Sequence, residues 1–266
     1  LRPVEVAYDP VPMPDPPEVT GRARRALVGG DMHYGYERRG GLLNPFHDER
    51  ALNIFLRVAE TYEPDEVVLL GDCMDFTEFS TRWLLRPEHD NTTQAALDAF
   101  ALYCATLRDV VGPYCAIYVI EGNHERRLWE NMLSGSARSI ALLHQAGSSE
   151  PVNSLAHLAG LRRLGIEYVG AYPDGYPKAK HWINPTLVAV HGEGTAGVPG
   201  ASAARMLADI DKSVIFGHTH RKESVTKTYH GADKTRVRSA TSFGCLCKQD
   251  GTVPHGRAQV SWLQGP

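Results

Sequence analysis

The chain has 266 residues, of which 42% are hydrophobic and 22% charged, and its net charge is −3. This composition is typical of a globular protein with room for one large α/β domain or two small ones. No apolar run approaches the roughly 18 residues of a membrane span, so we expect no membrane partner. The charge balance lacks the basic excess typical of nucleic-acid-binding proteins. No signal peptide is visible, and an odd number of cysteines favours reduced thiols and a cytoplasmic location.

Residues 1–24 are rich in proline, which predicts an extended arm without a folded core. We expect this arm to lie against the body of the protein or against a neighbouring chain, and the oligomeric state stays open. Residues 25–266 are interpreted as a single domain. Within it, residues 132–180 form a longer connection than a minimal loop requires, and we expect a cap or insert there.

Short apolar runs with helical patterns between them begin at residue 26. Asp48 is a candidate N-cap for a helix of about 15 residues, and the apolar spacing from Leu97 to Leu107 predicts a second helix. Strand–helix–strand repetition predicts a largely parallel sheet with right-handed crossovers. After residue 222 three further segments predict a meander that adds a second sheet, the last of them at 258–263. The five runs interpreted as buried strands are 26–30, 67–70, 116–120, 186–190 and 213–216.

Polar side chains able to bind metal follow each of these five runs. A single Asp or His after a strand is more often a turn residue or a helix cap. Five loops that all carry such groups indicate a site, because the carboxyl ends of parallel strands meet at one edge of a sheet. The residues concerned are Asp31, His33, Asp72, Asp75, Asn123, His124, His191, His218 and His220.

The order of these motifs is D-x-H, GD-x-x-D, GNHE, HG and GH-x-H, over residues 31–220. This series resembles that of the calcineurin-like metallophosphoesterases. The resemblance implies an α/β fold in which two mixed β-sheets pack as a sandwich flanked by helices.

The same resemblance implies a centre of two divalent metal ions with one shared ligand, Asp72. All the implied ligands offer oxygen or nitrogen, which favours Mn²⁺, with Fe or Zn²⁺ as alternatives. Cys245 and Cys247 are interpreted as wall or core residues, because a lone C-x-C is a weak metal signal. The implied ligands are Asp31, His33, Asp72 and His220 for one ion, and Asp72, Asn123, His191 and His218 for the other.

The implied reaction is the attack of a metal-bridging hydroxide on phosphorus. His124 would act as the general acid for the departing oxygen. Asp75 matches the family position that pairs with this histidine, and would orient it and raise its basicity.

Substrate contacts are predicted where the chain departs from the protein Ser/Thr phosphatases of the family. Phe76 stands in place of a phosphate-binding arginine and is a candidate wall of an apolar pocket. Arg126 and Arg127 either replace the lost charge or form a solvated helix face. Tyr34 either stacks on a substrate base or is an ordinary loop tyrosine.

Our leading hypothesis is a phosphoesterase that hydrolyses a phosphodiester or phosphomonoester of a small substrate such as a linear or cyclic nucleotide. One alternative is a nuclease or nucleic-acid end-processing phosphatase. The net negative charge of the chain argues against this alternative. A second alternative is a metal-binding scaffold without catalysis. If the protein is virus-encoded, its expected location is the host cytoplasm.

Overall fold

The computed structural model describes residues 23–81, 85–134, 143–144, 146, 151–171, 174–230 and 235–254. The predicted arm up to residue 22 and the predicted strand at 258–263 lie outside these ranges. Within them, no helix is both long and apolar enough to cross a membrane.

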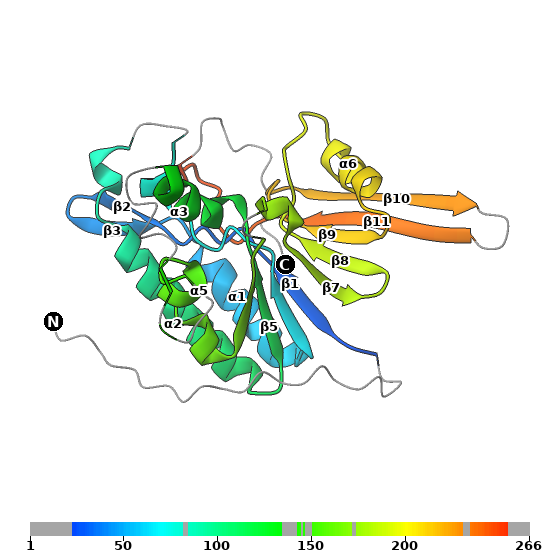
Figure 1. Cartoon of the computed structure of the whole chain (residues 1–266), viewed down its shortest axis with the longest axis horizontal. Helices are drawn as coiled ribbons and strands as arrows, with labels where there is room; N and C mark the ends of the chain where they lie inside the picture. The colour runs from blue at the N-terminus through cyan, green and yellow to red at the C-terminus, as the bar shows by residue number, and fades with distance from the viewer. Residues whose placement is uncertain are drawn as a thin grey trace.

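The first sheet is wholly parallel, with the strand order β1-β4-β5-β6. Two helices, α1 (Glu49–Tyr62) and α2 (Thr93–Val111), form the crossovers and cover one face of it (Figure 1). The predicted N-cap is confirmed, because the Asp48 carboxylate accepts the backbone N–H of Arg50 and Ala51. The strands are β1 (Ala26–Gly29), β4 (Glu66–Leu69), β5 (Ala116–Ile120) and β6 (Ile166–Val169).

Alternate residues of β4 lie in two different apolar cores. Val67 and Leu69 pack with the two crossover helices, whereas Val68 and the following Leu70 pack towards the second sheet. Successive side chains of a strand point to opposite faces. A strand covered on both faces therefore needs the unbroken apolar run that its sequence shows.

The second sheet is mixed, with the order β10-β11-β9-β8-β7. Its β9 is parallel to both β11 and β8, and the remaining pairs are antiparallel. Helix α6 (Ala201–Asp209) packs on its outer face (Figure 1). The runs at 186–190 and 213–216, expected in the parallel sheet, lie in this second sheet instead. The strands are β7 (Lys180–Asn184), β8 (Leu187–Val190), β9 (Ser213–Phe216), β10 (Lys222–His230) and β11 (Thr235–Phe243).

The two sheets face one another across a shared apolar layer. That layer contains Val68 and Ile120 from the first sheet and Ala189 from the second. The order helix, sheet, sheet, helix is the predicted sandwich, which is confirmed. Only the second sheet is mixed in the described chain; the first is parallel because each of its connections returns through a crossover.

The connections outside the sheets contain further short elements. Residues 155–169 lie within the interval expected to hold a cap or insert. Their short helices pack beside α2, and their strand β6 completes the first sheet, so this part of the interval belongs to the main body. The elements are β2 (Tyr36–Arg39), β3 (Leu42–Pro45), η1 (Thr77–Phe79), η2 (Pro87–His89), α3 (Asn123–Ser134), α5 (Leu155–Leu158), η3 (Leu161–Leu164) and η4 (Tyr176–Lys178).

Candidate metal centre

The loops that follow the strands of both sheets bring the predicted metal-binding side chains together. Two compact groups of ligand atoms form, and Asp72 is common to both. Nearly all members are buried, with His218 half-buried. The first group is Asp31, His33, Asp72 and His220; the second is Asp72, His191 and His218, with the Asn123 side chain beside it.

In the first group the acceptor atoms converge. His33 Nδ1 lies 2.8 Å from a carboxylate oxygen of Asp75, so this nitrogen carries the proton and donates it. In the neutral form of His33, Nε2 is an acceptor that faces His220 Nε2 at 3.1 Å, and His220 Nε2 lies 3.3 Å from Asp31 Oδ1. Several acceptor atoms therefore face one another, and a cation between them would offset their electrostatic repulsion.

The second group is also built around an imidazole whose Nδ1 is used in a hydrogen bond. His191 Nδ1 lies 2.8 Å from the carbonyl oxygen of Leu70 and must donate to it. Its Nε2 faces Asn123 Oδ1 at 3.1 Å, His218 Nδ1 at 3.2 Å and Asp72 Oδ2 at 3.3 Å. Burial alone would lower the pKa of His191, but the Asp72 carboxylate raises it to about 9. A positive charge is therefore favoured at this position.

The donor atoms of both groups fit divalent cations. Carboxylate, imidazole and amide groups suit Mn²⁺, Fe and Zn²⁺. Burial would raise the pKa of Asp72, yet His124 and His191 hold it well below its usual value, so the shared carboxylate is ionised. Asp31 is ionised too: burial opposes its charge, but His220 lowers its pKa.

The backbone of these loops is held in an unusual conformation. Five of the proposed ligands have a positive φ, between 46° and 68°, which costs a non-glycine residue about 1–3 kcal/mol. Glycine is required beside them: a Cβ at Gly122 would overlap the Asp72 carboxylate, and one at Gly217 would contact that of Asp31. The five are Asp31, His33, Asp72, His218 and His220.

Glu125 was not assigned a role by the sequence, although it is the last residue of the GNHE motif. Its buried carboxylate accepts the backbone N–H of Asp72 and Gly122, each at 2.9 Å, and that of Met74 at 3.0 Å. Burial, with the nearby Asp72 charge, raises the pKa of Glu125 to about 7. Glu125 thus joins the loop of the shared aspartate to the loop of the third motif.

Asp75, predicted to pair with His124, contacts both His124 and His33 through its carboxylate. The Asp75 carboxylate lies closer to His33, at 2.8 Å, than to His124 Nδ1, at 3.5 Å. His124 Nδ1 instead donates to the backbone carbonyl of Asp75 at 2.8 Å. Asp75 therefore orients a proposed metal ligand with its side chain and the proposed acid with its main chain.

Arg127 is the predicted substrate contact that the structure brings to the centre. Its guanidinium donates to His124 Nε2 at 2.7 Å and to the carbonyl of Asp75 at 2.9 Å, and the residue is buried. Burial and the Arg127 charge lower the pKa of His124 to about 4, despite the nearby Asp72 carboxylate. His124 Nε2 is thus an acceptor in this arrangement, with a cationic donor directly beside it.

The other predicted substrate contacts lie elsewhere. Tyr34 is 4% exposed and stacks on His47 within the main core, so it does not offer a free face to a base. Phe76 is 3% exposed and packs in the same core, with its backbone in the left-handed region. Arg126 pairs with Glu130 one turn along α3.

Cys247 is a second contact of the centre that the sequence did not identify as such. Cys245 and Cys247 pack in a small buried cluster, and the predicted core position is confirmed. The Cys247 sulfur also lies 3.9 Å from His220 Nδ1, within reach of a weak hydrogen bond. Three imidazoles of the centre are thus each oriented through their second nitrogen: by a carboxylate, by a carbonyl and by this thiol.

A family model described as calcineurin-like phosphoesterase matches residues 24–222 of the chain. That interval contains every motif loop of the centre. The chain belongs to the calcineurin-like phosphoesterase family. The family depends on a dinuclear metal centre, and the buried His and Asp groups of this phosphoesterase are able to bind metal.

Two phage proteins are similar to this phosphoesterase over most of their length. The gene 54 proteins of Mycobacterium phages D29 and L5 are each 30% identical to it, over 83% of this chain and 82% of theirs. Among solved structures, the Pseudomonas putida nuclease MPE gives a TM-score of 0.38 at 16% identity, covering 88% of this chain and 81% of that one. Yfce, a phosphoesterase from E. coli, gives 0.36 at 13% identity, covering 86% and 84%.

Proposed function

We propose that this phosphoesterase hydrolyses a phosphodiester or phosphomonoester of a small substrate such as a linear or cyclic nucleotide. The observation that carries the proposal is the pair of buried ligand groups that share Asp72, with His124 and Arg127 at their edge. The two phage relatives and the five free cysteines support action in the cytoplasm of a host cell.

The charge of the centre suits a phosphate ester. Asp31 and Asp72 contribute two negative charges. Two divalent cations, Mn²⁺ in our proposal and Fe or Zn²⁺ as alternatives, would supply a net positive charge for phosphate oxygens and lower the pKa of a bound water towards neutrality. The ligands Asp31, His33, Asp72 and His220 would hold one ion, and Asp72, Asn123, His191 and His218 the other.

The chain's own residues then act on the leaving group. As a water oxygen bonds to phosphorus, the opposite P–O bond breaks and the departing oxygen needs a proton. His124 takes up a proton at Nε2 once Arg127 no longer donates to that atom, and gives this proton to the departing oxygen, while Asp75 keeps the imidazole in place through its carbonyl. Arg127, which contacts His124 Nε2 in this structure, moves its guanidinium to a phosphate oxygen as substrate enters.

A second candidate function is that of a nuclease or nucleic-acid end-processing phosphatase. The observation that favours it is a separate pocket, lined by three arginines and described below. The net charge of −3 limits this candidate to short or locally bound nucleic acid rather than non-specific binding of duplex DNA.

A hydrolysis panel with added Mn²⁺ tests the proposal. It contains aryl phosphomonoesters and phosphodiesters, 2′,3′- and 3′,5′-cyclic nucleotides, dinucleotides and short DNA. Turnover of at least one ester, abolished by a chelator and restored by Mn²⁺, supports the phosphoesterase. Tight metal binding without hydrolysis of any panel member would instead support a metal-binding scaffold without catalysis.

A further inference from the structure

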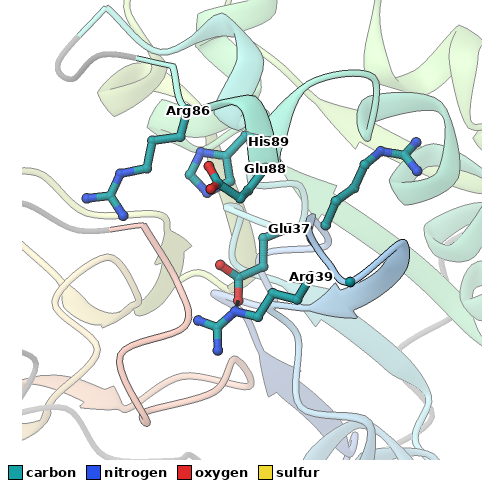
Figure 2. A pocket seen from close by; sticks show the side chains of 7 residues that line it. Glu37, Arg39, Arg86, Glu88 and His89 are labelled. Carbon is teal, nitrogen blue, oxygen red and sulfur yellow. Dashed lines mark ion pairs between the residues drawn. The ribbon is translucent and has the colours of Figure 1, made fainter.

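A pocket of about 390 Å³ lies between the β2–β3 hairpin and the short helix η2 (Figure 2). Its lining is strongly charged and carries both signs. None of these side chains belongs to the metal-binding groups or to the catalytic residues proposed above. The residues used below are Glu37, Arg38, Arg39, Arg86, Glu88 and His89.

The two walls of the pocket are joined to one another. Arg38 donates from the hairpin to the carbonyl oxygens of Asp90 and Asn91, at 3.4 and 3.1 Å, just after η2. On the other side, the Glu78 carboxylate accepts the backbone N–H of Asn91 at 2.7 Å and that of Thr93 at 2.8 Å. These contacts fix the shape of the pocket.

The pocket is also fixed relative to the metal centre. Glu78 lies in η1, which follows Asp75 in the loop of the second motif. On the hairpin side, Glu37 is four residues after His33, so their Cα atoms are at most about 14 Å apart. Both walls of the pocket thus continue along the chain into metal-binding loops.

His89 is the buried member of the pocket lining. The side chain is 6% exposed, and its Nδ1 has no hydrogen-bond partner in the described part of the chain. A buried ring nitrogen without a partner is rare, because its desolvation is not compensated. Figure 2 places His89 beside Glu88, with Arg86 and Arg39 on either side of the pocket.

The mixture of charges limits the class of ligand. Arg39 pairs with Glu37 at 2.7 Å, and Arg86 and Glu88 are both exposed at the pocket wall. A free phosphate would meet two carboxylates there. A nucleotide matches better, because guanidinium groups bind its phosphate and stack on its base, while carboxylates accept hydrogen bonds from the amino groups of the base.

We propose that this pocket binds the neighbouring nucleotide of a di- or oligonucleotide whose scissile phosphodiester lies at the metal centre. The inference rests on the proposed function and narrows its substrate class. The volume lies in the range of small-molecule sites. A nucleotide phosphate would sit against Arg86 and Arg39, with the base reaching the Glu88 carboxylate.

The double variant R39A/R86A tests this site, because both side chains are exposed and outside the catalytic machinery. We expect its KM for a dinucleotide to rise about tenfold or more, with kcat and the KM of an aryl phosphodiester unchanged within about twofold. The matched control is R57A, which removes an exposed arginine of α1 and should change neither substrate. The proposal would be overturned if KM rose equally for both substrates, or if KM rose for neither of them.

A binding measurement separates this inference from the proposed function. Fluorescence anisotropy with a labelled trinucleotide, in the presence of a chelator, reads affinity without turnover. We expect R39A/R86A to bind at least about fivefold more weakly than the wild type and R57A. Equal affinity of all three proteins would refute the pocket even if the enzyme is active. Loss of affinity in R39A/R86A alone would support the pocket even if the wild type hydrolyses nothing in the panel.

Discussion

The two sheets contribute different chemistry to the candidate metal centre. Loops of the first sheet supply both carboxylates, the Asn123 amide and only one imidazole, that of His33. Loops of the second sheet supply only imidazoles, those of His191, His218 and His220. The carboxylates of the centre thus come from one sheet and most of its imidazoles from the other.

The sheets also differ in how they are packed. The first is covered by a large cluster that includes α1 and α2, whereas the outer face of the second has a much smaller one around α6. Cations at the centre would therefore connect a strongly packed sheet to a weakly packed one. We therefore expect metal binding to stabilise the second sheet more than the first.

The largest effect is expected from removing the charge that both halves share. D72N should lower activity by more than about a thousandfold, because both cations lose a ligand. Removing a single donor to a transition state usually lowers kcat by only roughly 10²–10³-fold. Metal content measured by atomic emission should fall as well. D98N, an exposed aspartate of α2, is the control. Normal metal content in D72N would show that neither group needs Asp72 to hold its ion.

The next largest effect on activity is expected from His124, the proposed general acid, which follows a strand of the first sheet. H124A should lower kcat by roughly a hundredfold to a thousandfold for an ester with an alkoxide leaving group, because the departing oxygen then lacks its proton donor. For p-nitrophenolate, which leaves without a proton, we expect a much smaller loss. Metal content should be unchanged. Equal losses for both leaving groups would exclude His124 as the acid.

A smaller effect tests the orientation of a second-sheet ligand. C247A should weaken metal binding by about 10–100-fold, the usual cost of removing a group that orients a ligand, while C247S keeps an acceptor for His220. Calorimetric titration with Mn²⁺ measures this. C104A removes a buried thiol from α2 and serves as the matched control. If C247A and C104A bind Mn²⁺ equally well, Cys247 has no orienting role.

The smallest effect is expected in amide hydrogen exchange, which tests whether the two sheets differ in how firmly they are packed. At a Mn²⁺ concentration about ten times the dissociation constant, amide hydrogen exchange in β8 and β9 should slow by about tenfold relative to the chelated protein. We expect less protection in β4 and β5, which their own core already holds. Uniform protection across all four strands would indicate that the sheets open as one unit.

The sequence by itself determined the strands and the chemistry at their ends. An apolar run such as 67–70 indicates burial on both faces, and the polar motif after it must lie at the strand end whatever the rest of the fold does. The N-cap Asp48 was predictable for the same reason, since the contacts that form it lie within three residues.

Only the tertiary structure decided which groups meet. Periodicity shows that residues 186–190 and 213–216 are buried, but not which sheet they join. The Asp75 carboxylate lies closer to His33 than to His124, and Phe76 is buried in the core from a left-handed backbone. Glu125 and Cys247 act across more than 25 residues of sequence, and the pocket joins segments 37–40 and 86–89. Such contacts depend on the direction in which each side chain leaves its loop, which no local pattern specifies.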